Sequence, residues 1–183
     1  YNEAFNYWNG YEPSPEVKNS QKKVAQELRA LTASPSTAEG ERLNHITRHI
    51  EFLTPYSESW SAAYQLHQVL QKAGELKKKG ETDEARAQVR NDGVPLWLKL
   101  APLVRDSLLI VQDYVSTRND LGTLASMHNK YERLALFRLR ASMKEYLGEL
   151  PAEVERLYEE VRRPDGAALA RVFIPTRPTL LRK

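Results

Sequence analysis

The chain has 183 residues, of which 41% are hydrophobic and 28% are charged, a balance that suits one folded domain and excludes disorder by composition. Its 27 basic and 24 acidic residues leave a net charge of +3. Such mixed charge is typical of a solvated helix surface, so we predict no nucleic-acid partner. No cysteine is present, which excludes disulfides and thiolate metal sites. No stretch approaches the ~18 consecutive apolar residues of a membrane span, so we predict no membrane partner.

Residues 1–14 read as an irregular connection that is rich in aromatic residues and ends in the sequence EPSP. Its candidate contact residues are Phe5, Tyr7, Trp8 and Tyr11. Large aromatic side chains are costly to leave in water, so we expect them to pack against a neighbouring domain of a longer chain. Stacking on the apolar faces of sugar rings is the alternative, which would make a polysaccharide the second partner.

The first helix is predicted to start at Ser14 and Pro15, with Ser as the N-cap and Pro in the first helical position. It ends near the sequence ASPS at 33–36. The apolar residues that share one face of this helix are Val17, Val24, Leu28 and Leu31.

A much longer helical run is predicted from the capping box Ser36–Glu39 to Lys79, with Gly80 as its stop. Apolar residues keep a helical spacing throughout this run. Pro55 interrupts it and removes one backbone hydrogen bond, so we predict a kink there. Because the apolar stripe continues across Pro55, both halves are expected to face one core.

Thr82 is the predicted cap of the next helix, which the sequence NDGVP at 91–95 should interrupt. A second piece resumes at Pro95 and is apolar on most sides, so we expect it to be the most buried helix. Pro102 lies inside this piece and predicts a second bend.

The sequence STRNDLGT at 116–123 is predicted to be a loop. A strong helix is predicted from Thr123 to Leu147, followed by a short helix that starts at Pro151. Residues 164–183 then read as an extended connection with a short strand in RVFIP. Residues 15–163 are therefore predicted to be an all-α bundle of about five helices, two of them kinked at proline.

Glu41, His45 and His49 recur every four residues and should share one helix face. Two His at this spacing beside a carboxylate can hold zinc. However, Ile46 stands where a metalloprotease motif needs its Glu, and the sequence marks no further ligand. We therefore predict no tightly bound metal and no cofactor.

Catalytic motifs are not found in the sequence. It has no cysteine nucleophile, no GxSxG elbow and no Gly-rich phosphate loop. Glycoside cleavage needs two carboxylates across a sugar-sized gap, and no spacing of acidic residues selects such a pair. We therefore predict that this chain is not catalytic by itself.

The predicted helix from Thr123 to Leu147 has two contrasting faces. Its basic face gathers Lys130, Arg133, Arg140 and Lys144 around Phe137. A solvated surface is the preferred interpretation, because one stripe of this length does not make a nucleic-acid site.

Arg138 falls inside the apolar arc of the same predicted helix. A buried guanidinium must be paired, since its desolvation is otherwise too costly. We therefore predict a structural ion pair for Arg138, with Asp106, Asp113 or Glu58 as the partner.

Two stretches, STRNDLGTLASMHNKYERLALFRLRASMKEYLGELPAEV and RVFIPTRPTLLRK, resemble a helical region of large bacterial polysaccharide-degrading enzymes of the glycoside hydrolase type. In those enzymes the region follows a catalytic barrel and precedes a β-sandwich. The resemblance implies a non-catalytic accessory domain that packs on the catalytic domain, in a periplasmic or extracellular protein. The alternatives are a stand-alone helical module that binds a protein through an apolar groove and a nucleic-acid binder that uses the basic stripe.

Overall fold

The computed structural model describes residues 14–31, 38–114, 118–129 and 136–162. The predicted all-α fold is confirmed, because helices account for nearly all of these residues and none of them lies in a strand. The predicted connections at 1–14 and 164–183 lie outside the described residues except for Ser14. The helices are α2 (Pro15–Leu31), α3 (Ala38–Lys78), α4 (Thr82–Gln88), the π-helical turn η1 (Val89–Gly93), α5 (Val94–Tyr114), α6 (Arg118–Asn129), α7 (Phe137–Leu147) and α8 (Ala152–Arg162).

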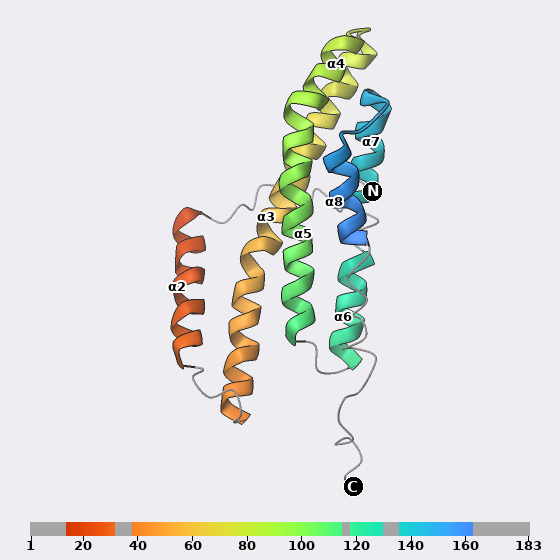
Figure 1. The fold of residues 1–183 in the computed structure, drawn as a ribbon. Helices are drawn as coiled ribbons and strands as arrows, with labels where there is room; N and C mark the ends of the chain where they lie inside the picture. The colour runs from red at the N-terminus through yellow and green to blue at the C-terminus, as the bar shows by residue number, and fades with distance from the viewer. Residues whose placement is uncertain (1–13, 32–37, 115–117, 130–135, 163–183) are drawn as a thin grey trace.

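Helices α3 and α5 form the frame of the molecule and run side by side (Figure 1). Helix α2 packs on the first half of α3, and α8 packs on α5. In Figure 1, α2 lies on one side of this frame and α6, α7 and α8 lie on the other. The result is an elongated bundle in which α2 is the outermost helix on its side.

Helix α3 is a single helix of 41 residues that contains Pro55. The prediction that the chain is helical on both sides of this proline is confirmed; the bend itself stays a prediction. Proline has no N–H to donate to the carbonyl four residues earlier. The carbonyl that Pro55 leaves without this donor is that of Glu51. The Ser57 hydroxyl donates to the carbonyls of Leu53 and Thr54, the same kind of back-bond that Thr47 makes to Leu43.

The predicted break at 91–95 is wrong, because the chain stays helical from Thr82 to Tyr114. The turn Val89–Gly93 widens instead into a π-helical turn, in which Val94 N–H donates to Val89 O, five residues earlier. Gly93 is buried and lies against α3: a Cβ added to it would lie 3.4 Å from Leu66 Cδ1, an ordinary van der Waals distance. The breaker residues are therefore accommodated by one widened helical turn, without a loop.

One further boundary differs from the sequence prediction. Residues 118–122 were predicted to be a loop but belong to α6, which starts at Arg118. The described parts of the predicted helix from Thr123 to Leu147 are helical, in α6 and α7, and its continuity across residues 130–135, outside the described part of the chain, stays a prediction. The stop at Gly148 is confirmed, with a φ of 74° that favours glycine.

The hydrophobic core lies between the second half of α3, the α4–η1–α5 segment, α7 and α8. On α3 it starts at Trp60 and continues through Leu66 and Leu70. Its largest fully buried side chains are Trp97, Leu66, Leu100, Leu136 and Met143. These residues come from α3, α5 and α7, with Leu136 directly before α7, so this half of the molecule holds together as one packed unit.

Candidate functional site

Helix α2 lies antiparallel along the first half of α3, and polar contacts fix its position. Near the start of α2, Lys18 Nζ lies 2.9 Å from Glu58 Oε1. Further along, Thr54 Oγ1 donates to Gln21 Oε1 at 2.9 Å. Ala25 is the only buried residue of α2. Because polar contacts dominate and little apolar surface is covered, α2 is a loosely anchored helix with two accessible sides.

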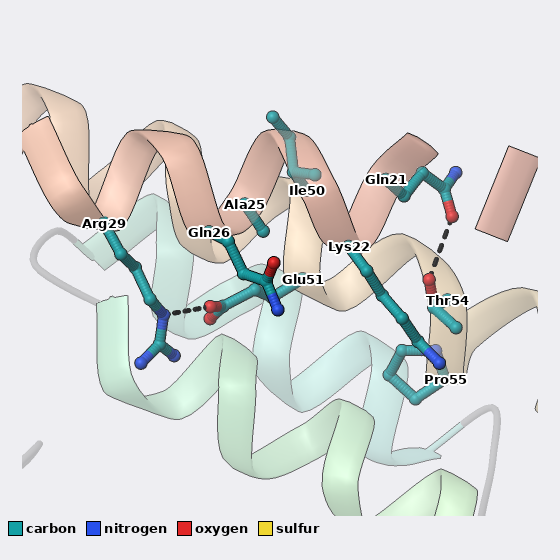
Figure 2. Close-up of a pocket in the computed structure, with 9 residues that line it drawn as sticks. All are labelled: Gln21, Lys22, Ala25, Gln26, Arg29, Ile50, Glu51, Thr54 and Pro55. Carbon is teal, nitrogen blue, oxygen red and sulfur yellow. Dashed lines mark hydrogen bonds and ion pairs between the residues drawn. The ribbon is translucent and has the colours of Figure 1, made fainter. Parts of the chain in front are cut away.

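One side of the α2–α3 contact is a groove of about 420 Å³, shown in Figure 2, which we call the polar groove. Ala25, Ile50 and Pro55 provide its apolar surface, and side-chain amides and charged groups surround them. The residues that line it are Gln21, Lys22, Ala25, Gln26, Arg29, Ile50, Glu51, Thr54 and Pro55. A groove of this composition can hydrogen-bond a small polar molecule, but it has no nucleophile placed beside a base.

Two charged residues of the polar groove, Arg29 and Glu51, belong to a chain of ion pairs across three helices. Arg29 on α2 donates to Glu51 on α3. Arg48, also on α3, lies 3.2 Å from Glu51 and 3.1 Å from Asp113 on α5. We call Arg29–Glu51–Arg48–Asp113 the charge chain. It ties the outermost helix to the frame of the molecule, so its first role is structural.

Glu51 is the central member of the charge chain, with a side chain that is 16% exposed. Partial burial raises the pKa of its carboxyl, but the hydrogen bonds and charges of Arg29 and Arg48 outweigh this effect and lower the pKa overall. Glu51 is therefore ionised at neutral pH. It cannot serve as the proton donor of a glycosidase pair, which needs a raised pKa.

The other side of the α2–α3 contact exposes large apolar side chains, which we call the apolar strip: Val17, Val24 and Leu31 on α2, with Ile46 and Leu53 on α3. Val24 is 42% exposed and Leu31 is 70% exposed. A shallow hollow of about 370 Å³ lies along this strip, lined in part by Ile50 and Ser20. Of the apolar face predicted for the first helix, Val17, Val24 and Leu31 therefore lie against solvent, whereas Leu28 is partly buried and Ala25 is buried.

The predicted site residues of the N-terminal connection, Phe5, Tyr7, Trp8 and Tyr11, all lie outside the described residues. Their proposed contacts therefore stay predictions.

The predicted histidine pair does come together on α3. The rings of His45 and His49 have centroids 4.4 Å apart, and His49 Nδ1 lies 2.9 Å from His45 O. Both side chains are exposed. Within the described residues, no group of three or more His, Asp or Glu could hold a metal ion. The prediction that this cluster binds no metal tightly stays untested.

Arg138 is exposed, although its neighbour Leu139 and also Met143 are buried. The expectation that it lies in the apolar arc is therefore wrong. Leu139 and Met143 enter the core, and Arg138 lies about 100° around α7 from Leu139. An exposed guanidinium carries no desolvation cost that a partner must offset, so the reason for predicting a structural ion pair no longer applies.

The predicted basic face is only partly present on α7. Arg140 Nε donates to Glu155 Oε2 at 2.7 Å, and its guanidinium lies 4.7 Å from the centroid of the Tyr158 ring. It therefore joins α7 to α8. Phe137 is half exposed, and the predicted members Lys130 and Arg133 lie outside the described residues.

Sequence reasoning missed both features of the α2–α3 contact. The apolar strip has a signal in the seven-residue spacing of Val17, Val24 and Leu31, but periodicity alone does not tell whether a face is covered. The charge chain has no signal, because Arg29 and Glu51 are far apart in the sequence.

Within the described residues, no helix is long and apolar enough to cross a membrane. No family model, curated protein or solved structure matches the chain.

Proposed function

We propose that this chain is a non-catalytic helical accessory domain that packs on a neighbouring domain of a carbohydrate-processing enzyme. The contact surface is the apolar strip of α2 and α3. In the resembling enzymes a catalytic barrel precedes this region, so the neighbouring domain would join the chain next to α2, close to the strip.

The observation that carries the proposal is the exposure of the apolar strip. Val17, Val24 and Leu53 line one hollow, and Leu31 and Ile46 lie seven residues along α2 and α3 from Val24 and Leu53; each of the five is at least 39% exposed. Single exposed apolar residues are ordinary, but a contiguous group marks a contact surface. Covering these side chains would stabilise the contact by roughly 25 cal/mol for each Å² of apolar surface removed from water.

The main alternative is a stand-alone helical module that binds a separate protein through the same strip. The two proposals differ in whether the covering surface belongs to the same polypeptide. A reading frame that encodes further domains on both sides would favour the accessory domain, and one that encodes this bundle alone would favour the module.

The proposal is tested with the parent polypeptide, by comparing amide exchange along α2 in the isolated chain and in the chain joined to its neighbouring domain. We expect slower exchange from Val17 to Leu31 in the joined protein. Leu31→Glu and Leu53→Glu should abolish this protection, because a carboxylate placed in the interface has no partner and costs free energy.

Leu109→Glu on α5 is the matched control, because Leu109 is 48% exposed but is not part of the strip. It should leave the protection of α2 unchanged. Equal exchange in the two proteins, or an equal effect of Leu109→Glu and Leu53→Glu, would contradict the proposal.

A further inference from the structure

We infer that the occupant of the apolar strip is the chain's own aromatic segment, residues 1–11, folded back along α2. This inference rests on the proposed function and deepens it. The segment would form the layer between the strip and the neighbouring domain, so that one set of rings serves both contacts.

The first argument is position and reach. Ser14 caps α2, since Val17 N–H donates to Ser14 Oγ at 3.3 Å, and Val17 is also the first residue of the strip. The segment is therefore joined to one end of the surface that it would cover. Thirteen residues can extend over about 43 Å, whereas the 17 residues of α2 rise about 26 Å. The segment can reach every residue of the strip, including Leu31 at the far end.

The second argument is the chemistry of the two surfaces. The hollow along the strip is lined mainly by Val17, Val24, Ile50 and Leu53, which offer apolar contacts and few hydrogen-bonding groups. Residues 1–11 contain Phe5 and Trp8 among five aromatic residues, and aromatic side chains contribute the largest apolar area per residue. A shallow apolar hollow and a segment dense in rings can therefore cover each other.

The absence of cysteine permits a direct test on the isolated full chain. Asn9→Cys is combined with Ser20→Cys, because Ser20 lines the hollow of the strip. The control combines Asn9→Cys with Asn19→Cys. Asn19 is exposed and adjacent in sequence, but it lies about 100° around the helix from Ser20. Mild oxidation should form the intramolecular disulfide at least about tenfold faster in the Ser20 pair. Equal rates in the two pairs would overturn the inference.

Two further measurements keep the test decisive. Replacing Phe5 and Trp8 with Ser should remove the preference for the Ser20 pair, and a preference that persists would show that the rings are not the occupant. Disulfide-linked dimers that form with the Ser20 pair alone would mean that a second copy covers the strip, which also overturns the inference. The two residues replaced on α2, Asn19 and Ser20, are both exposed. Helix content, measured by circular dichroism, checks that each variant folds.

The inference and the proposed function can fail separately. A cross-link in the isolated chain, without protection of α2 by the neighbouring domain, would support the inference and contradict the proposed function. Protection of α2 by the neighbouring domain, without a preference for the Ser20 cross-link, would support the proposed function and contradict the inference.

Discussion

Helix α3 is buried along its second half, where Trp60, Leu66 and Leu70 enter the core. Along its first half the same helix leaves Ile46 and Leu53 about half exposed. The second half is surrounded by α4, η1, α5 and α7, whereas the first half has α2 on one side and α5 on another. One unbroken helix is therefore packed in the hydrophobic core along its second half and only partly covered along its first half.

This difference shows that a helix can stay unbroken along its whole length while only part of it is packed in an apolar core. Apolar residues keep their helical spacing in both halves of α3, but a core also requires facing apolar surfaces. On the first half, α2 turns Ala25 towards α3 and its larger apolar residues away. Stability is therefore expected to be concentrated in the second half and contact with other surfaces in the first.

The largest expected effect compares two leucines of α3. Leu66→Ala should lower the free energy of unfolding by about 2–5 kcal/mol, because Leu66 is fully buried and its loss leaves a cavity. Leu53→Ala should lower it by no more than about 1 kcal/mol in the isolated chain, because Leu53 is 45% exposed. Urea denaturation of both variants measures the contrast. Similar losses would show that Leu53 is packed as tightly as Leu66, and not only covered along a shallow strip.

A smaller effect is expected at the centre of the charge chain. Glu51→Gln should lower the free energy of unfolding by about 1 kcal/mol, because it weakens two partly buried ion pairs at once. Glu153→Gln is the control, since Glu153 and its partner Arg156 are both more than half exposed, and its effect should be within about 0.5 kcal/mol. Equal losses in the two variants would show that the charge chain does not hold α2.

The same carboxylate predicts a pH dependence with a definite sign. Because the pKa of Glu51 is lowered in the folded chain, its contribution to stability is fully present above its unfolded pKa of about 4.3. This contribution is lost as the pH falls through the lower folded pKa. The slope of stability against pH in this acidic range should therefore be smaller in Glu51→Gln.

A pH effect from the second half of α3 is expected nearer neutrality. Burial lowers the pKa of His67, so the unfolded chain takes up a proton before the folded chain does. The free energy of unfolding should therefore start to fall as the pH drops below about 6.5. Below the folded pKa of His67, this residue should cause no further fall in the free energy of unfolding. His67→Gln should remove this slope, whereas His45→Gln in the exposed first half should leave it in place.

The smallest effect is expected at Arg138. Because this residue is exposed, Arg138→Met should change the free energy of unfolding by no more than about 0.5 kcal/mol. Thermal denaturation of this variant and of the parent chain measures the change in stability. A loss of several kcal/mol would show that the guanidinium has a buried partner after all.

Local chemistry made three helix ends predictable from the sequence, whereas the predicted cap Thr82 is wrong, because Thr82 is the first residue of α4 and Glu81 holds the N-cap position without a side-chain hydrogen bond. Ser14 caps α2 through its hydroxyl, and Gly80 and Gly148 end α3 and α7 with φ values of 87° and 74°. Each of these features depends on a few consecutive residues, which the sequence presents together.

Features that depend on distant residues were not predictable. The π-helical turn at 89–93 packs against Leu66 on α3, and the charge chain joins residues as far apart as Arg48 and Asp113. The orientation of α2 on α3 depends on packing that one sequence does not reveal. Both sides of the candidate site therefore required the structure.

The position of Pro55 has a mechanical consequence. It lies 17 residues from the start of α3, so the first half forms an arm of about 26 Å at 1.5 Å per residue. A change of about 10° at the proline would displace the far end of this arm by about 4–5 Å, by the same helix geometry. Helix α2 lies along the arm and would be carried with it. A small angular adjustment at one residue could thus position an entire docking surface against a partner, while the packed second half stays in place.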